Sequence, residues 1–141
     1  PDTLRSYGVA NAGDRPLDKV HAEALQAVPE AHAAFLAARP TLHQAGEAVF
    51  VHAGIRPGVA LAEQTETDLV WIRDLFLTET ASFGPLVVHG HTALDAATHY
   101  GNRLNLDSGA AYGGPLSAVV IEGREAALLT PQGRQRLEIS R

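Results

Sequence analysis

The amino-acid sequence predicts an α/β fold in which short helices come first and a mixed sheet follows. Three observations predict it. Apolar residues recur at helical spacing within residues 17–38, two apolar runs of strand length each end at a histidine, and short apolar runs separated by glycines follow residue 103. At 141 residues with 45% hydrophobic content, the chain fits one globular domain, residues 1–141.

Two helical segments are expected near the start of the chain. The apolar positions of residues 17–28 lie on one helical face, and Ala31–Ala38 resumes the pattern until Pro40 ends it. Because Pro29 separates the segments, two short helices and one kinked helix both fit. Asp14, just before the first segment, is expected to be a turn or helix-capping residue.

The middle of the chain alternates strands and a helix. A strand is expected over Glu47–His52, and a loop over Ile55–Gly58, where proline and glycine break regular structure. A helix is expected over Asp68–Leu77, followed by an apolar strand over Leu86–Val88. The predicted apolar face of that helix comprises Leu69, Ile72, Leu75 and Phe76.

The last third of the chain is expected to form further strands. They are Arg103–Asp107, Ser117–Glu122, Ala126–Leu129 and Arg136–Ile139. The glycine-rich run Asp107–Ser117 precedes a strand and lacks the Lys-Ser/Thr ending of a phosphate-binding loop, so it is interpreted as a hairpin connection packing below the site. Tyr112 within it either faces a substrate cleft or packs at the sheet edge with its hydroxyl in water.

Composition excludes several classes of function. The net charge of −5 and the lack of Lys/Arg clusters argue against a nucleic-acid partner. No apolar span of about 20 residues and no signal peptide is apparent, so no membrane association and a cytoplasmic location are expected. The sequence has no cysteine and no methionine and starts PDTLRSYG, and we expect it to be part of a longer polypeptide.

Histidines stand at the carboxyl ends of two predicted strands. VFVHAG places His52 after one strand, and LVVHGH places His89 and His91 after the other. Neutral imidazole is a common ligand of zinc, manganese and iron, and the adjacent small residues let a metal and its substrate approach the backbone. A shared metal site is therefore predicted, although each histidine taken singly also fits a core or surface residue. Four others lie in helical or loop contexts and are not assigned to the site: His21, His32, His43 and His99.

Several longer segments carry a family resemblance. HAGIRPG, DLVWIRDLFL, VVHGHT and LNLDSGAAYGGPLSAVVIE, in this order, resemble the carboxyl-terminal half of bacterial serine/threonine-type phosphoprotein phosphatases of the calcineurin-like metallophosphoesterase superfamily. TLRSYG followed by VPEAHAAFL is similar to the segment that these proteins place shortly after their GNHE motif. The resemblance implies half of an αββα sandwich with a two-metal site at the strand ends, where metal-bound water attacks a phosphate ester.

The resemblance also implies roles for individual residues. His52 and His91 match the two histidines that ligate the second metal, and Arg73 matches an arginine that grips the substrate phosphate through its planar fork. His89 has no counterpart among the ligands and is placed just behind them or facing the phosphate. The implied cofactors are divalent ions, two per complete site, with manganese expected and iron or zinc as alternatives.

Other interpretations of these segments stay open. Taken alone, Arg73 fits a helix-surface arginine paired with Asp74 or Glu79. Trp71 is expected to pack against the protein rather than to stack on a ligand. Ala93 stands where many relatives have proline after GHT, which bears on loop rigidity more than on metal binding.

The amino-terminal motifs of the family, DxH, GDxxDRG and GNHE, are not found in the sequence. GDRPLD at Gly13–Asp18 lies after the TLRSYG segment and lacks the DRG ending. Two imidazoles without a carboxylate compensate little of a divalent charge, so weak metal affinity and poor activity are expected of this chain alone. Uncovered apolar strands would also favour self-association or retention of the missing half.

The expected function is metal-dependent hydrolysis of phosphate monoesters, with a phosphoprotein or a small phosphoester as substrate. Diadenosine tetraphosphate hydrolases share the HAG and GHT segments, so this second substrate class stays open. A third hypothesis, a non-catalytic binding module, is supported only by the missing motifs. Assays on both substrate classes, and a search for GNHE upstream of Pro1, discriminate among the three.

Overall fold

The computed structural model describes residues 2–140. It is a mixed α/β architecture with short helices before a mixed sheet, which confirms the predicted fold class. The chain divides into two compact units, residues 1–40 and 41–141. Among residues 2–140, no helix combines the length and the apolarity needed to cross a membrane. The expectation of one domain, cut from a longer one, stays a prediction.

The first unit is helical, with α1 (Asp2–Ser6), α2 (Leu17–Ala27) and α3 (Glu30–Ala37). Val28 has extended backbone angles, φ −81° and ψ 120°, as expected for a residue before proline, so α2 and α3 are two separate helices. Within the described part of this first unit, the buried apolar side chains are Val9 and Val20. Asp14 closes a turn, because its amide donates to the Asn11 carbonyl at 3.1 Å, so the turn role expected of it is confirmed. It does not cap α2, whose cap position is Pro16 without a side-chain hydrogen bond.

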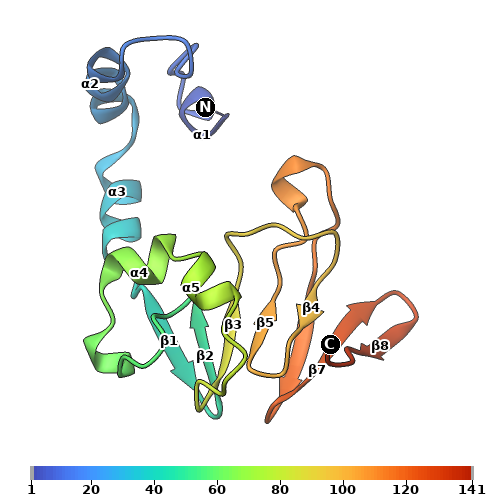
Figure 1. Cartoon of the computed structure of the whole chain (residues 1–141). Coiled ribbons are helices and arrows are strands. Elements are labelled where there is room, and N and C mark those ends of the chain that lie inside the picture. Colours follow the sequence, from blue (N-terminus) through green and yellow to red (C-terminus); the bar gives the residue numbers. More distant parts are fainter. Residues whose placement is uncertain (1, 141) are drawn as a thin grey trace. The chain divides into compact units, whose positions relative to one another are not determined.

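The second unit contains a five-stranded sheet with the order β1-β2-β3-β5-β4 (Figure 1). Its strands are β1 (Leu42–Ala45), β2 (Ala48–Val51), β3 (Leu86–His89), β4 (Thr98–His99) and β5 (Arg103–Asn105). The three central strands are parallel, and both edge strands are antiparallel to their neighbours. Every residue of β3 and β5 is buried, as expected for parallel strands covered on both faces.

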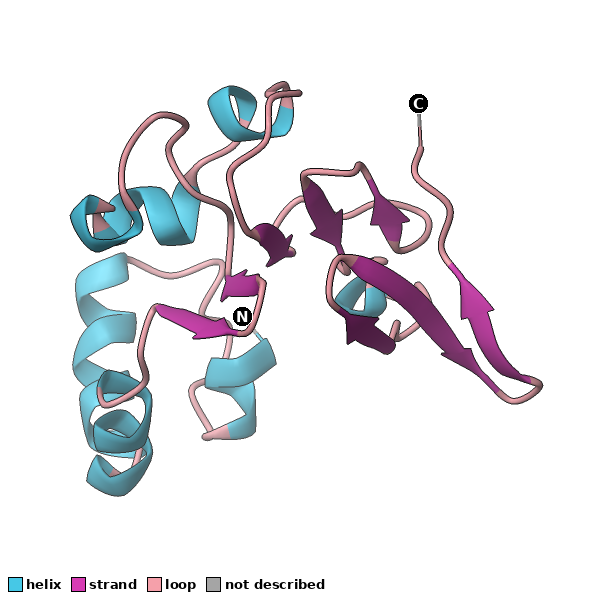
Figure 2. Cartoon of the chain, turned by 90° about the horizontal axis from the view of Figure 1, so that it is seen from below, coloured by secondary structure: helices cyan, strands magenta, loops and turns pink. Residues whose placement is uncertain are grey.

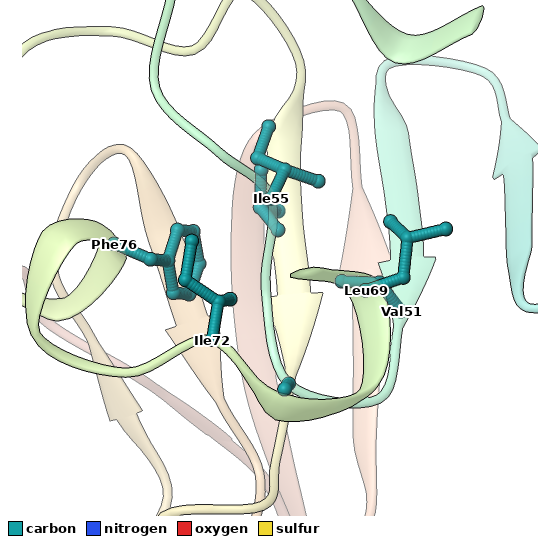
Figure 3. Close-up of a cluster of buried hydrophobic side chains, with 7 residues drawn as sticks. Val51, Ile55, Leu69, Ile72 and Phe76 are labelled. Carbon is teal, nitrogen blue, oxygen red and sulfur yellow. The ribbon is translucent and has the colours of Figure 1, made fainter. Parts of the chain in front are cut away.

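One face of this sheet is covered by α4 (Glu66–Trp71) and α5 (Asp74–Leu77). Their apolar side chains pack with those of β2, β3 and the loop after β2 (Figure 3). The cluster comprises Val51, Ala53, Ile55, Leu69, Ile72, Phe76 and Val87. Asp68, at the start of α4, is held by Arg56 and Thr65, and these hydrogen bonds, that of Arg56 first, lower the pKa of Asp68. The IRPG loop is thereby tied to α4.

The predicted single helix over Asp68–Leu77 is wrong. Ile72 has ψ 143°, and Arg73 has φ −134° and ψ −99°, so the helix breaks between α4 and α5. The break lets both Ile72 and Phe76 turn into the cluster, at 8% and 0% exposure. Leu75, which was expected on the apolar face, is left exposed.

A second, antiparallel sheet packs against the other face of the first (Figure 2). Its strands are β6 (Val119–Glu122), β7 (Glu125–Thr130) and β8 (Gly133–Arg136). Ala126 on β7 joins the buried cluster of Ala48, Leu86, Val88 and Leu104 from the first sheet. The strands predicted over Ser117–Glu122 and Ala126–Leu129 are thus confirmed within one or two residues.

Two predictions for this region are wrong. The last strand, β8, spans Gly133–Arg136 instead of Arg136–Ile139, and Ile139 makes only an isolated bridge to His99. Asp107–Ser117 is not a hairpin connection, since it joins β5 of one sheet to β6 of the other. Tyr112 within it is 89% exposed and lies in a short 3₁₀ turn, not at a sheet edge.

Candidate metal and phosphate site

The predicted site lies where two parallel strands end side by side. Parallel pairing sets Phe50 of β2 beside Val88 of β3, so His52 and Gly90 follow at the same edge of the sheet. The amide of Gly90 donates a hydrogen bond to the His52 carbonyl at 2.9 Å, and the amide of Ala53 donates to Leu69 at 2.8 Å. The backbone that carries both histidines is therefore fixed to the sheet and to α4.

His52 and His91 are brought together, as the sequence predicts for a shared site. Nε2 of His52 lies 3.0 Å from Nδ1 of His91, and the two ring centroids are 4.8 Å apart. His91 has φ +66°, a left-handed backbone that non-glycine residues adopt at a cost and that is often found at functional sites. This conformation turns the His91 ring toward His52.

The pair fits a divalent metal in part. Two nitrogens bound to one ion at about 2.0–2.1 Å stand about 2.8–3.0 Å apart in octahedral geometry and about 3.3–3.4 Å apart in tetrahedral geometry, and the observed 3.0 Å lies in this range. Burial, then Arg73 and His52, lower the pKa of His91, which favours the neutral imidazole that a metal requires. The Nε2 atom of His91 is buried and has no hydrogen-bond partner among residues 2–140. A single hydrogen bond between the rings accounts for the pair equally well.

The remaining ligands of a complete site are not gathered here. Within the described part of the chain, no group of three or more His, Asp or Glu side chains could hold a metal ion. Among the described carboxylates, Asp107 is the best candidate for a third ligand. It follows β5 and lines the same groove as His52 and His91, and its negative charge raises the pKa of His91 against the larger lowering influences. Its Oδ1 accepts a hydrogen bond from the Gly109 amide. Asp107 was not predicted as a site residue, because its place beside the histidines depends on the parallel pairing of β5 with β3.

Arg73 lies beside the histidine pair at the break between α4 and α5. It follows Trp71, whose ring contacts His91, by two residues, and its positive charge contributes to the lowered pKa of His91. Arg73 is exposed and forms no ion pair with any described residue, so the pairing with Asp74 or Glu79 is not formed. An exposed guanidinium without a carboxylate partner can bind a phosphate through two oxygens.

His89 lies behind the pair, on the side of the sheet covered by α5. Its ring packs edge-on against Phe76 with a centroid distance of 4.8 Å, and it is 4% exposed. Its Nδ1 is 3.2 Å from the Gly90 carbonyl, while Nε2 has no partner among residues 2–140. Burial lowers the pKa of His89 to about 4, so the ring is neutral in the folded protein at neutral pH.

We expect His89 to make the metal-free protein less stable in acid. The unfolded chain binds a proton at His89 below pH 6.5 and the folded chain only near pH 4, so the free energy of unfolding falls as the pH drops through this window. The loss at pH 4 is about 3 kcal/mol, accrued at up to about 1.4 kcal/mol per pH unit. Urea unfolding in EDTA from pH 7 to pH 4 measures it. His89→Leu is expected to flatten the profile and His43→Gln is not; identical profiles for wild type and His89→Leu would contradict the assignment.

A groove of about 410 Å³ runs beside the histidines. Phe50, Val88 and Leu106 contribute apolar surface to it, and His52, His91 and Asp107 contribute polar groups. A larger cavity, about 530 Å³, lies near His99, but both of its arginines are engaged: Arg136 pairs with Glu125 and Glu138, and Arg124 donates to the carbonyls of Gly84 and Gly101. The groove beside the histidines is therefore the better candidate site. Phe50 is 37% exposed, and the self-association expected from uncovered apolar strands stays a prediction.

Comparison with known proteins shows the fold of the chain. No protein-family model matches the sequence, and no curated protein matches it. A solved structure described as a "putative diadenosine tetraphosphatase" superposes with a TM-score of 0.54 over 85% of this chain, at 24% identity. The chain spans 60% of the length of that protein. The likeness supports the mixed α/β fold, while the finer resemblance to serine/threonine-type phosphatases stays a prediction.

Proposed function

We propose that this chain forms part of a metal-dependent phosphoesterase that hydrolyses phosphate monoesters, either phosphoserine and phosphothreonine or small phosphoesters. The observation that supports it is the approach of His52 Nε2 to His91 Nδ1 at the carboxyl ends of two parallel strands, beside an arginine without a carboxylate partner. Fold likeness to a protein described as a diadenosine tetraphosphatase agrees with a phosphoesterase of this general class.

In this function, metal binding, phosphate binding and positioning would fall to different residues of the chain. His52 and His91 would hold one divalent ion, with manganese expected, and the other ligands of a two-metal site would come from outside the described residues. When bound, such ions lower the pKa of a water molecule and polarise the phosphoryl oxygen. Arg73 would orient the phosphate by donating to two of its oxygens, and its charge persists throughout turnover. His89 would fix the ring positions from behind through its packing on Phe76.

Arg73→Ala in the full-length gene product is expected to lower kcat/KM about 100-fold, because one preorganised donor to the phosphate is lost. Phosphate release from p-nitrophenyl phosphate with Mn²⁺ measures it. The kcat/KM of Arg73→Lys should lie between those of the wild type and Arg73→Ala, because lysine keeps the positive charge but lacks the planar fork of the guanidinium. Arg134→Ala, an exposed arginine on β8, is the matched control. Equal loss in both alanine variants would remove Arg73 from the site.

A second candidate substrate is a dinucleoside polyphosphate, and the observation in its favour is the description of the structurally similar protein. Hydrolysis of diadenosine tetraphosphate, a phosphoserine peptide and p-nitrophenyl phosphate by the same preparation separates the two classes. If the folded full-length protein hydrolyses none of them with Mn²⁺, Fe²⁺ or Zn²⁺, the non-catalytic binding module becomes the better account.

A further inference from the structure

Trp71 is a large apolar side chain left in water beside the site. It is the last residue of α4, where the backbone break at Ile72 and Arg73 turns Leu69 and Ile72 into the core. Trp71 itself is 68% exposed, so the expectation that it packs against the protein is wrong. Exposed apolar side chains also occur elsewhere in the chain, at Leu17 and Tyr112 for example, but Trp71 differs from them because its ring contacts His91 of the candidate site.

The surroundings of Trp71 indicate what such a ligand carries. The indole meets the ring of His91 edge-on, with a centroid distance of 5.7 Å and planes 85° apart, so the two rings share a narrow contact and most of the indole surface is open. Arg73, two residues further on, is exposed and forms no ion pair with a described residue. An open aromatic face and an exposed guanidinium therefore lie two residues apart on the segment that contacts His91.

We propose that Trp71 stacks on a planar aromatic ring that the substrate carries close to its phosphate. The inference rests on the proposed phosphoesterase function and narrows its substrate to aryl phosphates or nucleotides. An indole offers a face of low polarity to any flat ring, and Arg73 beside it receives the phosphate. A phosphoserine or glycerol phosphate would use Arg73 alone and leave Trp71 in water.

The fluorescence of the chain reports on this contact without any need for turnover, because Trp71 is the single tryptophan of the sequence. With excitation at the red edge of the indole band and metal-free protein, phenyl phosphate and adenosine monophosphate are each expected to quench the emission saturably. Inorganic phosphate and glycerol phosphate are the matched anions without a ring and should leave it nearly unchanged. Comparison of phenyl phosphate with adenosine monophosphate distinguishes an aryl from a nucleotide source of the ring.

Kinetics of the full-length protein complete the test. Trp71→Leu is expected to raise KM for the ring-bearing phosphate about tenfold, with KM for glycerol phosphate unchanged, and Trp71→Phe is expected to recover most of the loss because it keeps a stacking face. These variants separate a lost ring contact from a lost fold, since unfolding would affect both substrates alike.

The outcomes distinguish the inference from the function on which it rests. If Trp71→Leu hydrolyses the ring-bearing phosphate with the same KM as the wild type, the stacking role is wrong, while the proposed phosphoesterase function still holds. Saturable quenching by the ring-bearing phosphates without hydrolysis of any ester would overturn the enzyme and keep the ring-binding surface. Emission typical of a buried indole in the free protein would show that another chain covers Trp71 and would overturn the proposal.

Discussion

Replacement of His52 by alanine is expected to weaken Mn²⁺ binding to this chain at least about tenfold, and replacement of both His52 and His91 is expected to abolish saturable binding. The reason is that these two imidazoles are the donors that converge, with 3.0 Å between Nε2 and Nδ1, while no larger ligand group exists within residues 2–140. At position 91 asparagine is the better replacement, because it tolerates the φ of +66° at which His91 stands.

Calorimetric titration with Mn²⁺ and Zn²⁺ measures the affinities. His43→Ala is the matched control, since His43 is an exposed histidine on β1 whose ring packs near Phe50 rather than His91. Wild type and the control should bind alike. Equal affinity in the double variant and the wild type would show that the ion binds elsewhere, and the proposed metal site would then be wrong.

Gly54→Ala is expected to lower the free energy of unfolding by about 3 kcal/mol. A Cβ atom at residue 54 would stand 2.6 Å from Cε1 and Cγ of Phe76, which is fully buried and cannot move aside. Phe76 in turn packs on His89, so the displacement would spread to the strand that carries the site. This explains why glycine follows His52 and Ala53 in the HAG segment.

Urea unfolding measures the effect. Gly58→Ala, with φ +74° and no atom within 4 Å of the added carbon, carries only the cost of a left-handed backbone, about 1 kcal/mol. Adding Phe76→Leu to Gly54→Ala should recover part of the loss, because the smaller side chain relieves the clash. A Gly54→Ala protein as stable as the Gly58→Ala protein would refute the close packing of the loop on Phe76.

Much of the fold follows from apolar patterning, and the exceptions have physical causes. The helices over residues 17–37 and the strands that lead to His52 and His89 were predictable because their apolar spacing persists to their ends and proline or glycine follows them. β1 was missed because its residues are mostly exposed and it is held by pairing with β2 across a two-residue loop. Such pairing leaves no apolar alternation in the sequence.

The helix break at Ile72 and the placement of Asp107 show a different limit. No proline or glycine marks the break; it exists because Ile72 and Phe76 both reach the core, which depends on where the sheet lies. Asp107 follows β5, yet its approach to the histidines depends on β5 pairing with β3 in parallel. Tertiary pairing of this kind cannot be read from one segment at a time. The histidine pair could be predicted, because each of the two apolar runs is followed by its own histidine in the sequence.

The location of the ion can be observed by nuclear magnetic resonance, with paramagnetic Mn²⁺ added in small amounts to the chain labelled at its seven histidine rings. The proposed site predicts that the ring signals of His52 and His91 broaden first, that His89 follows, and that the exposed His43 of the same unit persists until much higher concentration. Broadening of His43 before His52 and His91, or together with them, would contradict a metal site at the ends of β2 and β3.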